Sequence, residues 1–221
     1  MRLSLFDLDH TLLDGDSDQL WCDWLVARGL LPRQPFAADS ARLMRDYAAG
    51  RASAQRFSDF YIGTLAGRSA AQWADERQRW FASEVAPRFK PQAGARVQRH
   101  AQAGDRVLLT TATNRFLAEP SAAWLGIAEL LATECEVDAE GRFTGGTTGT
   151  LNMRAGKVDR LKAWLAERGQ VLADVHTLFY SDSMNDLPLL EQVNEPVVTH
   201  GDERLRAIAQ QRGWRQADLR A

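Results

Sequence analysis

The sequence of 221 residues predicts an α/β protein with a Rossmann-like, three-layer core built on a parallel sheet. Short apolar runs suited to buried strands alternate with stretches of helical spacing, as in parallel sheets covered by helices. Polar clusters follow several of these runs, and open α/β sheets bind ligands at the carboxyl ends of their strands. The segment 14–89 has helical patterns only, so we expect an all-helical insertion after the first strand.

Composition narrows the class of protein. The chain has 27 basic and 29 acidic residues, so no strong field favours nucleic acid or an anionic membrane as a partner. Asp7 and Asp9 interrupt the apolar N-terminus too early for a signal peptide or a membrane span. Cys22 and Cys135 are far apart and form no Cys-x-x-Cys motif, which suits a reducing cytosol. We expect a cytoplasmic protein, and the sequence gives no indication of its oligomeric state.

The first apolar run, Leu3–Phe6, is short enough for one buried strand and leads into Asp7, Asp9 and Thr11. The two-residue period of a strand sends Asp7 and Asp9 to the same side. Two carboxylates about 4 Å apart repel by roughly 4 kcal/mol at an effective dielectric of ~20. A shared proton or a cation must offset this repulsion. The ordinary alternative is that one aspartate caps the following turn.

The insertion is expected to contain four helices. Gly29 is a typical C-terminal stop for the first. Ser69 opens the last with a capping-box pattern, and Pro87 ends it. The expected helices are approximately 17–28, 37–49, 53–65 and 70–86.

The rest of the chain alternates between strands and helices. The expected strands are 106–110, 175–180 and 196–199, with a hairpin of 130–137 and 142–144. The expected helices are 91–103, one that ends near 125, one that opens at 154–157, and 202–211.

Three of these elements carry polar clusters. The strand 106–110 ends in the hydroxyl-rich segment 110–115 just before a helix, and hydroxyls, turn N–H groups and a helix N-terminus all favour an anion. Lys157 lies at a helix start, although the helix dipole favours a cation at the other end. The segment 181–188, Ser-Asp-Ser-Met-Asn-Asp-Leu-Pro, follows the strand 175–180. Helix capping by threonine and a solvated lysine are the ordinary alternatives.

Taken in order, the clusters resemble the four motifs of the haloacid dehalogenase superfamily. The segment Asp7–Thr11 resembles the Asp-x-Asp-x-Thr form found in its phosphatases. Thr111 matches the hydroxyl of the second motif, with Thr110 as its close rival. Lys157 matches the lysine of the third motif, for which Arg154 is the alternative.

The fourth motif of the superfamily is commonly Gly-Asp-x-x-Asn-Asp. The segment 181–186 matches it except at Ser181, where the family usually has glycine. A serine can occupy this place if its backbone stays out of the left-handed region.

The helical insertion resembles the C1-type cap of the phosphoserine phosphatase-like branch, which closes over the active site. Some close relatives in that branch are described as histidinol-phosphate phosphatases. The resemblance implies a catalytic core of residues 1–13 and 90–221 and a cap of residues 14–89. A helical subdomain without a gating role is the alternative.

The resemblance implies a phosphomonoesterase that acts on a small-molecule phosphate ester through an aspartyl-phosphate. Asp7 would be the nucleophile, and Asp9 would protonate the leaving alcohol and then activate water. Thr111 and Lys157 would hold the phosphoryl oxygens.

The resemblance also implies Mg²⁺ as the cofactor. Asp7, the main-chain carbonyl of Asp9, and Asp182 would hold the ion, with water and phosphate completing the octahedron. Asn185 and Asp186 would support this site from just outside it.

Substrate recognition is expected to involve Asp16, nine residues after Asp7, where phosphoserine phosphatases carry a glutamate that receives the substrate's amine. We hypothesise an amine-bearing ester, and a helix cap is the alternative role for Asp16. Ala112 is a further candidate for substrate binding. Arg45, with Arg42 and Arg51 as alternatives, could meet a substrate carboxylate, which histidinol phosphate lacks.

Two other functions fit the same motifs. A phosphotransferase or phosphomutase would use the same aspartyl-phosphate, and a non-catalytic protein would only bind a phospho-ligand. Asp9 favours the phosphatase or transferase readings, because dehalogenases lack an acid at that place and transport ATPases carry threonine there. We assign no role to His10.

Overall fold

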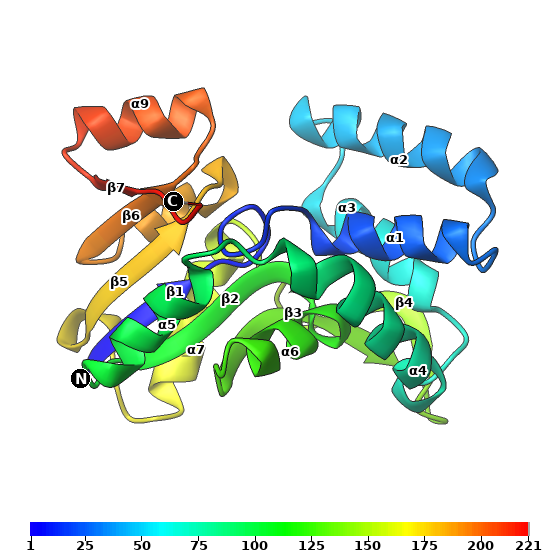
Figure 1. The fold of residues 1–221 in the computed structure, drawn as a ribbon, viewed down its shortest axis with the longest axis horizontal. Coiled ribbons are helices and arrows are strands. Elements are labelled where there is room, and N and C mark those ends of the chain that lie inside the picture. The colour runs from blue at the N-terminus through cyan, green and yellow to red at the C-terminus, as the bar shows by residue number, and fades with distance from the viewer. Residues whose placement is uncertain (221) are drawn as a thin grey trace.

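The computed structural model describes residues 1–220, and its centre is a seven-stranded sheet of order β4-β3-β2-β1-β5-β6-β7 (Figure 1). Neighbouring strands are parallel except for β3 and β4, which form the antiparallel hairpin predicted from the sequence. The strands are β1 (Arg2–Phe6), β2 (Arg106–Asn114), β3 (Glu129–Val137), β4 (Phe143–Thr148), β5 (His176–Ser181), β6 (Glu195–Thr199) and β7 (Arg215–Ala217).

Helices cover both faces of the sheet, which confirms the predicted three-layer class. Leu3 and Leu5 of β1 belong to one buried cluster with α7, α8 and α9, whereas Phe6 belongs to a second with α5 and α6. The two clusters follow from the alternation of side chains along a strand. These helices are α5 (Ala93–Gln102), α6 (Arg115–Trp124), α7 (Ala155–Ala166), α8 (Leu187–Leu190) and α9 (Glu203–Gln211).

The strand order reverses at β1. The chain proceeds from β1 to β2 and β3 on one side, and β5 and β6 lie on the other side. In open α/β sheets, ligands bind beyond the carboxyl ends of the strands at such a switch point. The fold therefore places the end of β1, where Asp7 and Asp9 follow, at the natural position for a site.

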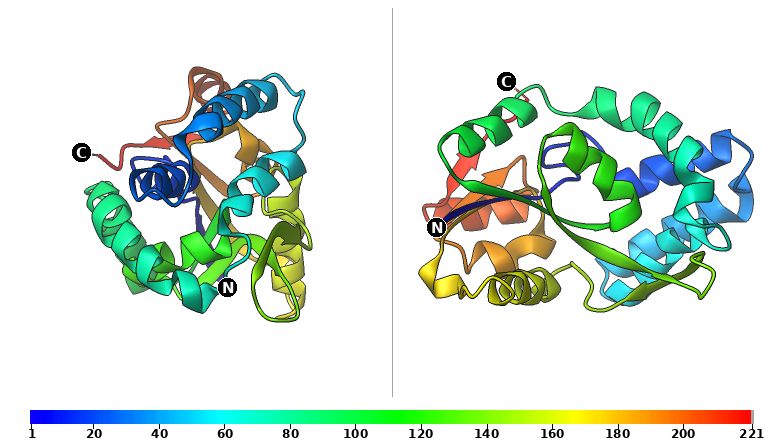
Figure 2. Two further views of the ribbon diagram at one scale, coloured as in Figure 1. Left: turned by 90° about the vertical axis from the view of Figure 1, so that its right-hand side faces the viewer. Right: turned by 90° about the horizontal axis from the view of Figure 1, so that it is seen from below.

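The insertion is helical, as predicted, and no strand of several residues occurs in its described part. Its helices lie on the side away from both chain termini (Figures 1 and 2). They are α1 (Ser17–Ala27), α2 (Arg33–Ala48), α3 (Ala54–Ile62) and α4 (Ala70–Trp80), with the short turns η1 (Gly63–Leu65), η2 (Phe81–Val85) and η3 (Ala86–Arg88).

Tryptophans join part of the insertion to the core. The Trp21 ring of α1 meets Trp73 and Trp80 of α4 edge-on, with centroids 5.4 Å apart in both pairs. It also lies 6.3 Å from the Phe116 ring of α6. Such edge-to-face pairs add to the free energy gained by burying the rings. Helices α1 and α4 are thus packed onto the core.

Two strands differ from the sequence prediction. Strand β2 does not stop at Thr110 but continues to Asn114, and its pairing with β3 is irregular over this stretch. A bulge of this kind lets a strand bend and carry polar side chains into a site. Strand β7 was not predicted, because its three residues have no apolar alternation and become a strand only by pairing with the edge of β6.

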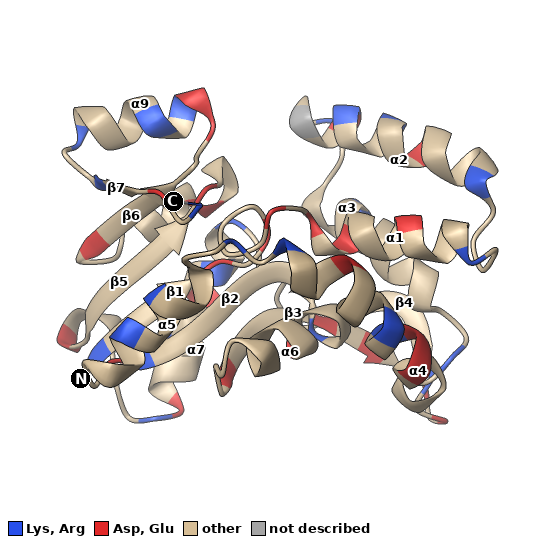
Figure 3. Cartoon of the chain, viewed as in Figure 1, with Lys and Arg blue, Asp and Glu red and all other residues tan. Residues whose placement is uncertain are grey.

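Charged residues of both signs are interspersed over the structure, and acidic ones gather where the chain enters α1 (Figure 3). No helix among the described residues has the length and apolar character needed to span a bilayer.

Candidate active site

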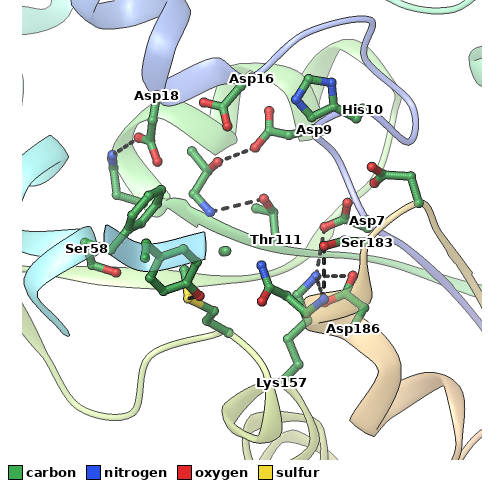
Figure 4. Close-up of a pocket in the computed structure, with 18 of the residues that line it drawn as sticks. Asp7, Asp9, His10, Asp16, Asp18, Ser58, Thr111, Lys157, Ser183 and Asp186 are labelled. Atoms are coloured by element: carbon green, nitrogen blue, oxygen red, sulfur yellow. Dashed lines mark hydrogen bonds and ion pairs between the residues drawn. The ribbon is translucent and has the colours of Figure 1, made fainter. Parts of the chain in front are cut away.

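An ion-pair cluster lies at the carboxyl end of β1. The Lys157 Nζ atom is 2.8 Å from Asp7 Oδ1 and 2.8 Å from the carboxylate of Asp186. Burial alone would lower the pKa of Lys157, but the charges of Asp186 and Asp7 outweigh it and hold the pKa above its ordinary value. Lys157 is therefore an ammonium ion beside the predicted nucleophile (Figure 4).

Thr11 connects two of the predicted metal ligands. Its hydroxyl lies 2.8 Å from Asp182 Oδ1 and 3.1 Å from Asp7 Oδ2, and it accepts the main-chain N–H of Asp182 at 3.0 Å. Burial and the charge of Asp7 raise the pKa of Asp182 to about 8. These two carboxylates thus share a buried place in which their negative charges are only partly compensated.

The Asp9 carboxylate turns toward the insertion. Its Oδ1 accepts from the main-chain N–H of Ser17 at 2.8 Å and from the Ser17 hydroxyl at 2.6 Å. Its Oδ2 accepts from the Thr113 hydroxyl. Burial, together with the charge of Asp16, raises the pKa of Asp9 to about 6 despite these hydrogen bonds. A carboxyl group with this pKa exchanges protons near neutral pH, as a general acid and base must.

The structure separates the two candidate threonines of β2. Thr111 lines the cavity next to Asp7, and its hydroxyl accepts the Thr113 N–H at 3.2 Å. The Thr110 hydroxyl instead accepts from the buried side-chain amide of Asn152 at 3.0 Å and is not part of the cavity wall. Ala112 also lines the cavity.

Two further positions explain how the loops reach the site. A Cβ at Gly156 would collide with the main-chain carbonyl of Leu151, so the close approach of the two backbones requires glycine. Ser181 has no positive φ, and its hydroxyl donates to Asp186 at 2.7 Å and accepts the Ser183 N–H at 3.1 Å. The serine thus fits the turn and adds a hydrogen bond that glycine could not make.

The side chain of Asn185 faces the rim of this cluster. It accepts from Arg154 Nε at 3.2 Å, and the Arg154 guanidinium lies 4.7 Å from the centroid of the Tyr47 ring of α2. Arg154 therefore contacts the insertion, whereas Lys157 contacts Asp7.

A cavity of about 290 Å³ joins these groups. Helices α2 and α3 of the insertion contribute one wall and the strand ends the other (Figure 4). Asp16 and Asp18 line it, and Asp16 also caps α1 by accepting the Gln19 N–H at 2.9 Å. Both roles foreseen for Asp16 are therefore compatible with its position.

The candidate arginines are not brought to the cavity. Arg45 is exposed and is not part of the lining. Arg42 pairs with Asp39 at 2.9 Å, and Arg51 pairs with Asp46 at 2.8 Å, both away from the cavity. Helix α2 points Tyr47 and Met44 into the cavity, and Arg45, between them, faces solvent.

The oxygen donors suit a small divalent cation. Asp7 and Asp182 would supply carboxylates to such an ion, and Asp9 its main-chain carbonyl. Magnesium is commonly held by one or two carboxylates plus water and substrate phosphate. Within residues 1–220, no three His, Cys, Asp or Glu side chains form an all-side-chain metal site. The carboxylates of Asp7 and Asp182, which both lie within hydrogen-bond distance of the Thr11 hydroxyl, are a donor set that fits a magnesium ion.

Several residues of the site had no role in the sequence prediction. Thr11 and Thr113 lie in predicted polar segments, and Ser17 and Asp18 lie at the start of a predicted helix. Their signal was the density of hydroxyl and carboxyl groups, but which of them face one another depends on the bulge in β2 and the entry angle of α1.

Comparisons with known proteins agree with this geometry. The sequence profile described as haloacid dehalogenase-like hydrolase matches residues 5–191. A histidinol-phosphatase of Neisseria meningitidis serogroup C (strain 8013) is 38% identical over 214 residues, which cover 96% of each chain. A phosphoserine phosphatase of Mycobacterium tuberculosis (strain ATCC 25618 / H37Rv) is 32% identical over 227 residues, which cover 98% of this chain and 70% of that protein.

Solved structures are also similar. A protein of unknown function from Bordetella pertussis Tohama I has a TM-score of 0.93 and 41% identity, with 99% of this chain and 98% of that chain covered. A phosphoserine phosphatase solved with an analogue of a phospho-aspartyl intermediate has a TM-score of 0.69 and 14% identity, with 100% and 93% covered, and shows the shared fold. The chain belongs to the haloacid dehalogenase-like hydrolase family.

Proposed function

We propose that this protein is a Mg²⁺-dependent phosphatase that hydrolyses a small, amine-bearing phosphate monoester through an aspartyl-phosphate. The observation that carries the proposal is the cavity in which Asp7, Asp9, Thr111, Lys157 and Asp182 face one another. Phosphate monoesters hydrolyse extremely slowly without a catalyst, and catalysis depends on positioning and charge neutralisation. This cluster of side chains supplies both positioning and charge neutralisation.

In the first half-reaction, an Asp7 carboxylate oxygen attacks phosphorus and the bond from phosphorus to the alcohol oxygen breaks. The Asp9 carboxyl group gives its proton to the departing alcohol. Lys157 and Thr111 hold the phosphoryl oxygens, so the developing negative charge lies against an ammonium ion and a hydroxyl. The products are the alcohol and an acyl phosphate on Asp7.

In the second half-reaction, water attacks phosphorus and gives a proton to Asp9. The bond between phosphorus and the Asp7 oxygen breaks, which releases phosphate and restores both carboxyl groups. Ser17 and Thr113 hold Asp9 through both steps. Magnesium, held by Asp7, Asp182 and the Asp9 carbonyl, would supply positive charge that neutralises the phosphoryl oxygens.

The cavity favours a substrate that has an amine and lacks a carboxylate. Asp16 offers a carboxyl group to an ammonium group, and Lys157 is the only Lys or Arg in the described lining. That lysine is already paired with Asp7 and Asp186. A histidinol phosphate-like ester therefore fits better than phosphoserine, whose carboxylate would meet no arginine. The similarity to a histidinol-phosphatase supports this choice.

We also propose the cap boundaries 14–89, a gating role for α2 and α3, and a cytoplasmic location. The cap boundaries and the gating role rest on the position of α2 and α3 in the cavity wall. The location rests on Cys22 and Cys135, which are both free thiols.

The test is phosphate release from histidinol phosphate, phosphoserine and O-phosphoethanolamine by wild type and Asp7→Asn, with Mg²⁺ or with EDTA. We expect release that needs Mg²⁺, is lost in Asp7→Asn, and is fastest with histidinol phosphate. A hydroxylamine-sensitive phosphoprotein should form in wild type only. If phosphate moves to an added alcohol instead of water, the protein is a phosphotransferase. If no ester turns over in a folded, Mg²⁺-loaded wild type, the phosphatase assignment is wrong.

A further inference from the structure

The cavity extends well beyond the groups that handle phosphate. In Figure 4, Asp7, Lys157 and Asp186 lie at one end, and Asp16 and Asp18 lie toward the other. In the proposed reaction, the phosphoryl group occupies the first end of the cavity and the substrate amine contacts Asp16. The part of the cavity beside Asp18 has no role in the reaction as described above.

Asp18 presents an acceptor to this part of the cavity. It is the second residue of α1, and its Oδ1 accepts from Asn114 Nδ2 at 3.2 Å. No other hydrogen bond from residues 1–220 reaches its carboxylate. Burial, together with the charges of Asp16 and Asp9, raises the pKa of Asp18 well above its ordinary range. Because Asn114 is the one described residue that donates to it, the Asp18 carboxyl group has hydrogen-bonding capacity left for a bound ligand.

Ser58 of α3 presents a second polar group to this part of the cavity. Its side chain lines the cavity and is drawn in Figure 4, and the residue is only 7% exposed. Its hydroxyl makes no hydrogen bond to any described residue, although a helical serine can bond to the preceding turn, as Ser83 does. The hydroxyl is open to the cavity, so it is free to bond to a ligand there.

Apolar side chains complete this part of the wall. Met44, Tyr47, Phe57 and Ile62 line the cavity, and the rings of Tyr47 and Phe57 lie 4.5 Å apart. Tyr47 is held in place by its hydroxyl, which donates to Met153 Sδ at 2.9 Å. Such a wall favours an apolar or aromatic group of the ligand rather than a second charged chain.

We infer that Asp18, Ser58 and the Tyr47–Phe57 wall form a subsite for a planar nitrogen heterocycle carried by the alcohol part of the substrate. An imidazole ring fits this pattern, because one ring nitrogen donates to Asp18 and the other accepts from Ser58. A phenyl ring would contact the wall but leave both polar groups unpaired. A carboxylate would be repelled by Asp18. The inference rests on the proposed function and specifies which residues contact the ring.

The test compares histidinol phosphate with phenylalaninol phosphate, which keeps the amine and an aromatic ring but has no ring nitrogen. We expect wild type to prefer histidinol phosphate at least about tenfold in kcat/KM, since leaving a buried polar group unpaired weakens binding by about this factor or more. Asp18→Asn and Ser58→Ala should each reduce this preference severalfold, mainly through KM. Asn at position 18 can still accept from Asn114, so the variant is expected to fold.

The matched control is Asp23→Asn, which removes a carboxylate from the same helix at an exposed position outside this cavity. Asp23→Asn should keep the wild-type preference.

Inhibition of wild type by free histidinol and free phenylalaninol gives a measurement that needs no variant, and histidinol should inhibit more strongly. Equal inhibition, or an unchanged preference in both Asp18→Asn and Ser58→Ala, overturns the subsite while phosphatase activity stands. Absence of phosphate release from every ester overturns the proposed function itself.

Discussion

Lys157 Nζ lies 2.8 Å from Asp7 Oδ1, although both side chains are almost completely buried. The same ammonium group contacts Asp186, so it compensates two carboxylates that would otherwise face each other without water. A buried charge that loses its partner is strongly destabilising. The relationship therefore ties the stability of the fold to the residues of the proposed chemistry.

Replacing Lys157 with methionine should lower both stability and activity. Two buried carboxylates would lose their cation, so we expect a loss of about 3–5 kcal/mol in the free energy of unfolding at neutral pH. Phosphate release should fall by orders of magnitude. Urea denaturation and ester hydrolysis measure the two effects. Lys162→Met, on the exposed face of the same helix, is the control and should change neither by much. Equal effects of the two substitutions would contradict the role of the buried pair.

The pH dependence of turnover should report Asp9. Its pKa is raised to about 6, and the first step needs its protonated form. For an alkyl phosphate ester we expect kcat/KM to fall as pH rises above about 6. The leaving group of p-nitrophenyl phosphate needs no proton. The ratio of wild-type to Asp9→Asn activity should therefore be much smaller with this ester than with the alkyl ester. If Asp9→Asn lowers the activity on both esters by the same factor, Asp9 is not the general acid.

Asp9 should also lower stability near neutral pH. Because its folded-state pKa lies above the ordinary value of 3.8, the unfolded chain loses the proton first, and the stability contributed by this group falls as pH rises from about 4 to about 6. Asp9→Asn should therefore be more stable than wild type at pH 7 by up to about 3 kcal/mol, with little difference near pH 4. Urea denaturation in EDTA at both pH values measures this. A constant difference across the range would exclude the titration as its cause.

Thr11 should affect metal affinity without touching the substrate. Its buried hydroxyl contacts Asp7 and Asp182 and accepts an N–H, so Thr11→Val leaves three polar groups short of a partner. We expect the Mg²⁺ concentration for half-maximal activity to rise about 10–100-fold, the usual effect of losing a group that orients metal ligands. Thr11→Ser keeps the hydroxyl and should stay within a few-fold of wild type. An unchanged Mg²⁺ requirement in Thr11→Val would contradict this role.

Local sequence patterns were sufficient for most of the architecture. The apolar run before Asp7, the capping box at Ser69 and the turn residues of the β3–β4 hairpin predicted elements that the structure contains. Periodicity and caps are local properties, so a single sequence carries them. The end of β2 and the whole of β7 were missed, because strands there depend on hydrogen bonds to neighbours distant in the chain.

The candidate site shows the same division. Asp7, Asp9, Thr111, Lys157 and Asp182 could be selected from motifs because each follows a strand or opens a helix, and the fold brings such positions to one edge. The motif favoured Thr111 but left Thr110 as a rival, because both occur in one polar run. The structure separates the two, since Asn152, 42 residues away, donates to the Thr110 hydroxyl.

Local sequence patterns predicted the three-layer fold and the order of the polar clusters, since these follow from side-chain chemistry and spacing, and the resemblance of those clusters to the family motifs implied the reaction class. Which side chains line the cavity depends on the tertiary structure. It turned Arg45 to solvent, placed Asp18 and Ser58 in one cavity, and set Ser17 and Thr113 on Asp9. These side chains come from separate elements, and their meeting depends on helix packing and on a strand bulge, for which local sequence holds no signal.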